Sequence, residues 1–249
     1  MPEHTQYVEV FAGAIWVLLE KEPVKIEIIN DINGDLINFY RVIQDKDKCN
    51  QLINKLYYLP KSREIFELFD KNIENSREEL NDIDRATMFY YLLKLVFGGR
   101  FDRIKKSFCV PNDGRKNINY DKFPEEFLEL HERFKNIYIE NKDYKYILDK
   151  YDRTDGLFFL DPPYLDTTEN NYRVKFDINE YQELKNKLDN LKGKFILTCN
   201  DNSELRNLFK DYYIKDNEVF YSVSGKTNGC KKYGELIITN YQINNLRLT

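Results

Sequence analysis

The sequence has little of what several common kinds of protein require. Its 249 residues include four cysteines with no C-x-x-C pair, and two histidines, His4 and His131, that lie far apart in the chain. Disulfide frameworks and zinc sites need clustered ligands, so we expect neither, and we expect no metal. No apolar run approaches the roughly 20 residues of a membrane span, and the N-terminus lacks a basic and then apolar leader. These absences predict a cytoplasmic protein with no membrane contact.

Positive charge is scarce overall but locally concentrated. The formal net charge of −4 argues against a nucleic-acid partner, because such partners usually select a basic face. Residues 97–118 nevertheless carry six basic and only two acidic side chains among turn-forming residues. A loop of this composition could reach a phosphate backbone, although a solvated surface loop explains the charges equally well. The six basic residues are Arg100, Arg103, Lys105, Lys106, Arg115 and Lys116.

Alternating strand and helix patterns at both ends of the chain predict an α/β protein. Helix faces are expected over 34–44 and between Tyr181 and Leu191, where apolar residues recur at helical spacing. Strands separated by helices predict a mostly parallel sheet with helices on both faces, and the last two strands predict an antiparallel hairpin. The expected strands are 7–11, 25–30, 156–160, 194–199, 218–224 and 234–241.

The middle of the chain has a different pattern. Residues from about 45 to 97 contain no good strand and several helical stretches, and the basic loop follows them. We therefore expect residues 1–44 and 136–249 to form one domain, with residues 45–135 as a helical insertion.

Ligands of such sheets bind at the carboxyl ends of the strands. Gly13 follows the first predicted strand and would let a ligand approach the backbone closely, while Asp31 follows the second strand and could hold ribose hydroxyls. Asp31 could also serve as the N-cap of the next helix, where the sequence offers more than one candidate, so both roles can coexist. The G-x-G-x-x-G pattern is missing, which argues against a dinucleotide and leaves a smaller nucleoside-bearing cofactor open.

The segment "LDPPY" at 160–164 resembles the catalytic motif of amino-group methyltransferases that use S-adenosylmethionine. Together with "YVEVFAGA", "FGGR", "KGKFILTCND" and "ELIITNY" in this order, it makes the chain similar, from Tyr7 to Tyr241, to the Dam-type DNA adenine N6-methyltransferases. The resemblance implies a Rossmann-like methyltransferase sheet, a target-recognition role for the helical insertion, S-adenosylmethionine as cofactor and double-stranded DNA as substrate. Taken alone, "DPPY" could also be a plain strand-ending turn.

The resemblance also implies roles for individual residues. Asp161 and the Pro162 carbonyl would polarise the adenine amine, Pro163 would fix the turn, and Tyr164 would stack on a flipped base. The implied cofactor-binding residues are Phe11, Ala12, Gly13, Asp31, Ile32 and Asp161. The implied DNA-binding residues are Arg100, Arg103, Lys105, Lys106, Arg115, Tyr172 and Lys175.

Two features depart from the family pattern. Relatives carry a lysine-containing cofactor segment ahead of the first strand, which residues 1–6 do not match, so we expect another segment or a partner chain to supply it. Relatives also have a second glycine where this chain has Ile15, and a β-branched residue should resist a left-handed backbone and crowd the cofactor. A weak or inactive DNA-binding relative, or a partner-dependent subunit, therefore remains an alternative, as does a methylase of cytosine N4, RNA or a protein amide. A restriction–modification, phage or chromosomal role also stays open.

Overall fold

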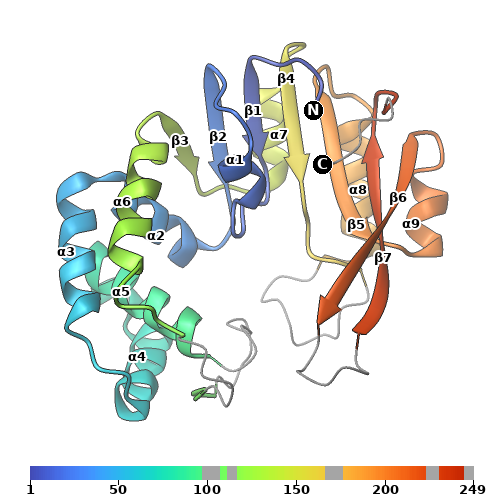
Figure 1. The fold of residues 1–249 in the computed structure, drawn as a ribbon. Coiled ribbons are helices and arrows are strands. Elements are labelled where there is room, and N and C mark those ends of the chain that lie inside the picture. Colours follow the sequence, from blue (N-terminus) through green and yellow to red (C-terminus); the bar gives the residue numbers. More distant parts are fainter. Residues whose placement is uncertain (97–106, 111–116, 166–175, 223–229, 244–249) are drawn as a thin grey trace. The chain divides into compact units, whose positions relative to one another are not determined.

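The computed structural model describes residues 1–96, 107–110, 117–165, 176–222 and 230–243. A seven-stranded sheet has the order β3-β2-β1-β4-β5-β7-β6 (Figure 1). The pairs β1–β2, β1–β4 and β4–β5 are parallel, whereas β7 is antiparallel to both β5 and β6. The strands are β1 (Gln6–Glu9), β2 (Ile26–Asn30), β3 (Ile137–Glu140), β4 (Gly156–Leu160), β5 (Lys194–Asn200), β6 (Tyr213–Ser222) and β7 (Cys230–Thr239). The predicted Rossmann-like α/β class with a terminal hairpin is confirmed.

Helices follow most strands, and polar side chains cap many of them. Asn33 accepts hydrogen bonds from the first backbone N–H groups of α2, and Asp143 and Asp177 cap α7 and α8 in the same way. The helices are α1 (Trp16–Glu20), α2 (Gly34–Gln44), α3 (Lys46–Tyr57), α4 (Arg63–Asn75), the 3-10 helix η1 (Arg77–Glu79), α5 (Asp82–Leu95), α6 (Phe123–Phe134), α7 (Tyr144–Tyr151), α8 (Ile178–Leu188) and α9 (Ser203–Leu208).

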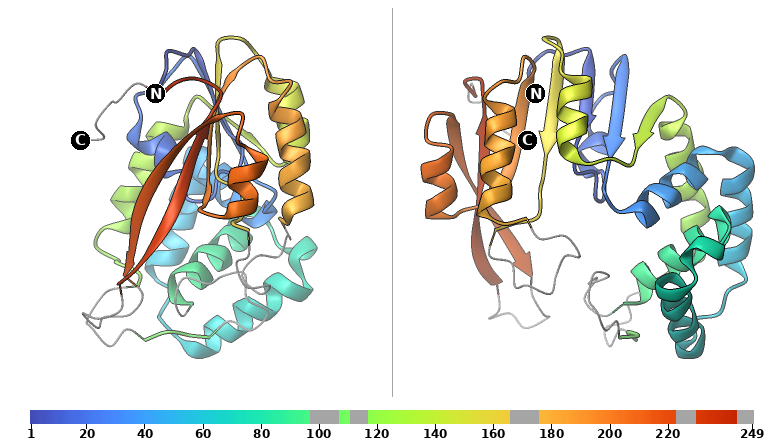
Figure 2. Two further views of the ribbon diagram at one scale, coloured as in Figure 1. Left: turned by 90° about the vertical axis from the view of Figure 1, so that its right-hand side faces the viewer. Right: turned by 180° about the vertical axis from the view of Figure 1, so that it is seen from behind.

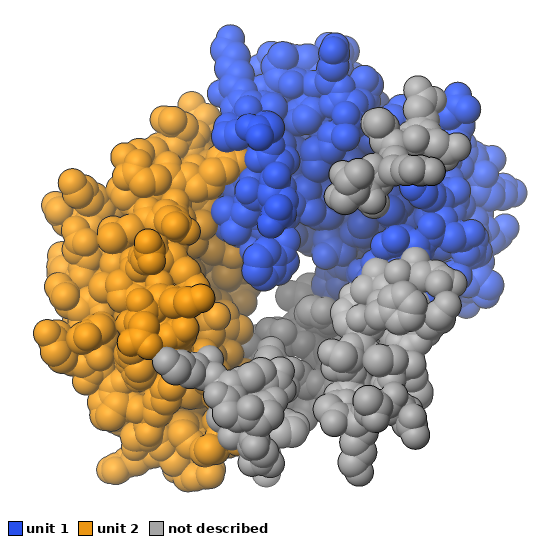
Figure 3. All heavy atoms as spheres, in the orientation of Figure 1, with its two compact units in different colours: residues 1–30, 142–169, 174–249 blue, residues 31–141, 170–173 orange. Residues whose placement is uncertain are grey.

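The chain forms two compact units (Figure 3). Unit 1 contains residues 1–30, 142–169 and 174–249, and unit 2 contains residues 31–141 and 170–173. The two units are defined by the contacts within each of them and not by function. The division into a catalytic domain and a target-recognition insertion remains a prediction.

The core of unit 1 lies on one face of its strands. Along β5, Phe195, Leu197 and Cys199 are buried while Ile196 and Thr198 are partly exposed, so the strand presents one apolar face to a core. Apolar residues of α7, α8 and α9 pack into the same core. Figure 2 shows α7 and α8 on that face and α1 on the opposite face. Side chains that alternate with the core residues therefore point to the second face.

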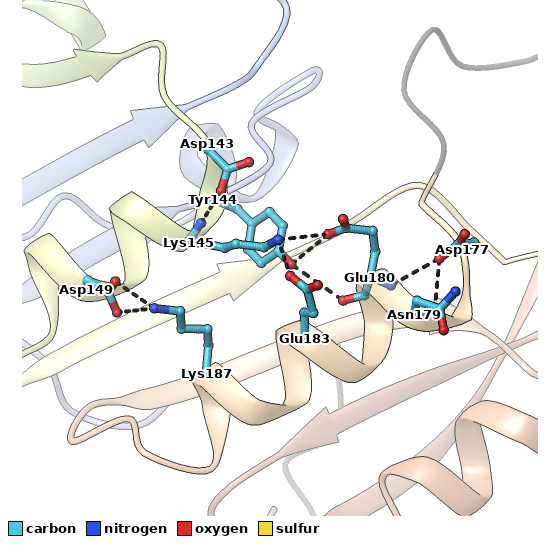
Figure 4. Close-up of polar contacts among 9 residues, drawn as sticks. All are labelled: Asp143, Tyr144, Lys145, Asp149, Asp177, Asn179, Glu180, Glu183 and Lys187. Carbon is cyan, nitrogen blue, oxygen red and sulfur yellow. Dashed lines mark hydrogen bonds and ion pairs between the residues drawn. The ribbon is translucent and has the colours of Figure 1, made fainter.

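Ion pairs join α7 and α8 at their surface (Figure 4). Lys187 Nζ lies 2.6 Å from an oxygen of Asp149, and Lys145 pairs with Glu183. Exposed pairs of this kind contribute roughly 0–1 kcal/mol each, so burial of the apolar core dominates the packing of these helices. A groove of about 520 Å³ beside them is lined by the same paired side chains, and we assign it no ligand.

Unit 2 is built around aromatic packing between helices. The rings of Phe39 in α2 and Tyr90 in α5 are stacked with centroids 5.7 Å apart, and Phe127 of α6 contacts both edge-on. Between residues 45 and 96, all of them described, the secondary structure consists of α3, α4, η1 and α5 together with one isolated bridge at Val96. The predicted helical middle is thus present.

Candidate active site

The segment 161–165 leaves the central strand of unit 1 at its carboxyl end. β4 lies between β1 and β5 and is parallel to both, and Asp161 directly follows its last residue, Leu160. This edge of a parallel sheet is where ligands bind in such folds. The strand register pairs Leu160 with Leu197, so Thr198 is the next neighbour across β5, and its Oγ1 donates a 2.6 Å hydrogen bond to Asp161 Oδ1.

The surroundings of Asp161 disfavour its charged form. The residue is exposed as a whole, yet protein atoms crowd its carboxyl group, and this desolvation raises its pKa above the ordinary value. The hydrogen bond from Thr198 lowers the pKa, and the negative charge of Glu235 raises it. The ionisation of the Asp161 carboxyl group therefore depends on side chains from β5 and β7.

Tyr164 is tied to the terminal hairpin. Its hydroxyl donates a 2.9 Å hydrogen bond to Oε1 of Glu235, which lies on β7 and is 9% exposed. A bond to a buried carboxylate is stronger than one between neutral groups. The ring of Tyr164 itself remains only partly buried.

Two further hydrogen bonds hold the backbone of the segment. The Tyr181 hydroxyl of α8 donates to the Pro163 carbonyl at 3.1 Å, and Asn200 Nδ2 of β5 donates to the Leu165 carbonyl at 3.0 Å. Residues 161–165 are thus fixed from β5, β7 and α8 at once.

The glycine turn after β1 leaves its backbone accessible. Gly13 has a φ of 48°, and an added Cβ there would meet no atom of the described residues within 4 Å. Ala12 N donates to Asn30 O at 2.8 Å, so the turn is anchored to the end of β2. The ring of Phe11 packs against Tyr144, with the ring centroids 5.5 Å apart. The open side of the turn at Gly13 fits the close approach of a ligand.

The expectation for Ile15 was wrong on backbone conformation. Ile15 has φ 53° and ψ 27°, which is the left-handed region that a β-branched residue was expected to resist. Its side chain is 2% exposed and its N–H donates to the Ala12 carbonyl at 2.8 Å. Burial of the side chain and this turn hydrogen bond offset the backbone strain, and they hold Ile15 as the residue before α1.

Asp31 and Ile32, which follow β2, belong to unit 2. Asp31 Oδ1 accepts a 2.8 Å hydrogen bond from Asn33 N, and the Asp31 carbonyl accepts one of 2.6 Å from Asn141 Nδ2. The N-cap of α2 is Asn33 rather than Asp31, so Asp31 is not needed for capping. Ile32 is 56% exposed.

A buried polar group beside the glycine turn was not predicted. Glu9 of β1 is 2% exposed, accepts a 3.0 Å hydrogen bond from the Tyr7 hydroxyl and another from the Leu18 backbone N–H. Burial raises its pKa to about 8. Nearby, Lys21 Nζ lies 2.6 Å from Glu27, and both side chains are buried. Glu9, Thr198 and Glu235 each lie next to an apolar strand residue, and this is the one signal in the sequence that they share.

The predicted DNA contacts cannot be placed. Their seven residues, Arg100, Arg103, Lys105, Lys106, Arg115, Tyr172 and Lys175, all lie outside the described residues. Within the described ranges, no group of three or more His, Cys, Asp or Glu side chains is arranged to hold a metal ion. In the same part of the chain no helix combines the length and the apolar character needed to cross a membrane.

Comparison with known proteins gives one family. A family model described as D12 class N6 adenine-specific DNA methyltransferase matches residues 1–223. The type II methyltransferase M1.LlaDCHI of Lactococcus lactis subsp. cremoris is 29% identical over 97% of this chain and 88% of its own length. The type II methyltransferase M.MjaIII of Methanocaldococcus jannaschii is 28% identical, covering 95% and 88% of the two chains. A DNA adenine methylase of Vibrio cholerae is 25% identical, covering 95% and 87%.

Proposed function

The chain belongs to the D12 class of N6 adenine-specific DNA methyltransferases, and from this premise we propose that it methylates an adenine flipped out of duplex DNA with S-adenosylmethionine as the methyl donor. The amine of a paired adenine is not accessible inside a duplex, so the base must leave the stack. One observation carries the proposal: Asp161 stands at the carboxyl end of the central parallel strand, with its carboxylate oriented by Thr198.

The residues of the segment suit activation of an amine. The adenine amine is a poor nucleophile because its lone pair is delocalised into the ring. Asp161 and the Pro162 carbonyl would each accept one of its hydrogen bonds, which stabilises the positive charge that develops on nitrogen. The proton released from nitrogen can pass to the Asp161 carboxylate. When bound, S-adenosylmethionine supplies a methyl group on a sulfonium sulfur, and the sulfur keeps the electron pair of the broken C–S bond.

The residues after β1 and β2 fit a nucleoside-bearing cofactor. Phe11, Ala12 and Gly13 would hold its methionine end, where the open backbone at Gly13 supports close contact. Asp31 and Ile32 would hold the ribose and adenine, since Asp31 is not the cap of α2. We propose these roles for the two segments separately.

DNA contacts are proposed for the basic loop. Arg100, Arg103, Lys105, Lys106 and Arg115 would bind phosphates or guanine edges, with Tyr172 and Lys175 close to the flipped base. A DNA substrate also agrees with a cytoplasmic location. The family match and the intact "DPPY" segment favour adenine N6 over cytosine N4, RNA or protein amides, and favour an active enzyme over a binding-only relative.

Calorimetric binding of S-adenosylmethionine tests the cofactor assignment. We expect Asp31→Ala to lose binding. Asp45→Ala is the matched control, because the side chain of Asp45, like that of Asp31, accepts a hydrogen bond from the backbone N–H two residues further on. The Asp45→Ala variant should bind S-adenosylmethionine normally. Equal binding by both variants would remove Asp31 from the site. Absence of binding by the wild-type chain, with or without DNA, would contradict the use of this cofactor by the chain alone.

A further inference from the structure

Glu235 is held rigidly beside the segment 161–165. In the antiparallel pairing of β5 and β7 it lies opposite Asn200. The neighbouring Gly234 carbonyl accepts a 2.8 Å hydrogen bond from Asp201 N, and a Cβ added at Gly234 would lie only 2.9 Å from Cβ of Asp201. A glycine is therefore required at this point for the close approach of the two segments, and this approach fixes where Glu235 stands.

The carboxylate of Glu235 fixes the far end of the Tyr164 ring. The backbone on both sides of Tyr164 is already held, at Pro163 by Tyr181 and at Leu165 by Asn200. The 2.9 Å bond from the Tyr164 hydroxyl to Glu235 adds a third point of attachment. With its backbone and its hydroxyl both anchored, the side chain has a defined position and a fixed long axis before any substrate arrives.

We propose that Glu235 is a positioning residue of the adenine site, which fixes the position of the Tyr164 ring and so prepares it to stack on the flipped base. The inference rests on the proposed stacking role of Tyr164. A preset ring saves the entropy of ordering the side chain when the base enters, which favours the productive geometry.

Glu235 also acts on Asp161 through its charge. Among the described residues, the groups that interact with Asp161 from the packed strands are Thr198 and Cys199 of β5, Glu235 of β7 and Glu9 of β1. Burial raises the pKa of Cys199 to about 12 and that of Glu9 to about 8, so both are neutral in mildly acidic solution. Of these groups, Glu235 is the one whose negative charge raises the pKa of Asp161.

A double-mutant cycle tests the contact. Methyl transfer to long unmethylated duplex DNA is measured for wild type, Tyr164→Phe, Glu235→Ala and the double variant. Each single change should lower kcat/KM about tenfold, the value expected for a lost hydrogen bond to a charged group. The double variant should be no worse than either single one, because both remove the same bond. Binding of S-adenosylmethionine should be unchanged throughout.

A pH profile tests whether the charge of Glu235 acts on Asp161, an effect that a merely structural role would not produce. Glu235→Gln keeps an oxygen acceptor for Tyr164 and removes the charge. It should retain most of the activity, and the acidic limb of its kcat/KM profile should move to lower pH, because the pKa of Asp161 falls. Glu183→Gln, a charge change on the surface of α8, is the control and should leave the limb in place.

The outcomes distinguish this inference from the proposed function. A wild-type chain that transfers no methyl group to adenine would contradict the proposed function itself. With an active wild type, independent addition of the losses in the cycle or full activity of Glu235→Ala would overturn the positioning role of Glu235. An acidic limb left unmoved by Glu235→Gln would overturn the effect of its charge on Asp161.

Discussion

The Thr198 hydroxyl donates a 2.6 Å hydrogen bond to the Asp161 carboxylate across the parallel strands β4 and β5. The bond favours the ionised form of Asp161, so it lowers the pKa that burial raises. A single hydroxyl on a neighbouring strand therefore helps keep the proposed amine acceptor charged.

Replacing Thr198 should move the pH profile in the direction opposite to Glu235→Gln. Thr198→Val removes the hydroxyl at nearly constant shape, so the pKa of Asp161 rises and the acidic limb of kcat/KM moves to higher pH. At pH values below the pKa of Asp161, kcat/KM of Thr198→Val should be about tenfold lower than that of the wild type. Thr198→Ser restores the hydroxyl and should restore the profile. An unshifted limb in Thr198→Val would show that the bond does not control Asp161.

Glu9 should make the stability of the protein depend on pH. Folding raises its pKa from 4.5 to about 8, so the folded chain keeps a proton that the unfolded chain releases. This stabilisation is complete below pH 4.5 and is lost as the pH rises towards 8. Glu9→Gln keeps acceptors for Tyr7 and Leu18 but cannot ionise.

Urea denaturation measures this effect. From pH 6 to pH 8 the free energy of unfolding of the wild type should fall by about 2 kcal/mol relative to Glu9→Gln. A constant difference between the two proteins over this range would mean that Glu9 is already ionised in the folded state.

At Ile15 a glycine variant should be more stable than an alanine variant, which reverses the usual order of stability. Both Ile15→Ala and Ile15→Gly lose the buried side chain, which costs on the order of 2–5 kcal/mol of unfolding free energy. At a φ of 53° glycine carries no steric penalty, whereas alanine carries roughly 1–2 kcal/mol. Thermal and urea unfolding should therefore find Ile15→Gly more stable than Ile15→Ala. The opposite order would contradict the left-handed conformation.

A buried ion pair should matter more to unit 2 than an exposed one. Arg85 Nε lies 2.6 Å from Asp35, whose side chain is 3% exposed, whereas Lys48 and Asp82 form an exposed pair. Arg85→Ala removes one of the positive charges that pair with the buried Asp35 carboxylate, and it should cost about 3 kcal/mol of unfolding free energy. Lys48→Ala should cost less than about 1 kcal/mol. Similar losses in both variants, measured by urea denaturation, would contradict this ranking.

The sequence predicted the elements with strong local signals. α2 was expected at 34–44 and β4 at 156–160, and both have those bounds, because capping residues and a compact apolar run mark them. β3 was not predicted, since its four residues, "IYIE", are too short for a periodic pattern. β6 begins at Tyr213 rather than at residue 218, because its first half is polar and lacks a strand signal.

The site was predictable only where a motif is continuous in sequence. Asp161 to Tyr164 are adjacent, so their pattern could be recognised. Thr198 and Glu235 lie 37 and 71 residues from their partners and reach them only through strand pairing. The left-handed Ile15 was missed because local preference opposes it, and burial of its side chain outweighs that preference.

The most direct measurement is the product of methyl transfer. The purified chain is incubated with unmethylated duplex DNA and isotope-labelled S-adenosylmethionine, and the DNA is digested to nucleosides for mass spectrometry. The account predicts label in N6-methyladenine, and none with Asp161→Ala that folds like the wild type. Label in another base, no label with a folded wild-type chain, or full activity of Asp161→Ala would contradict it.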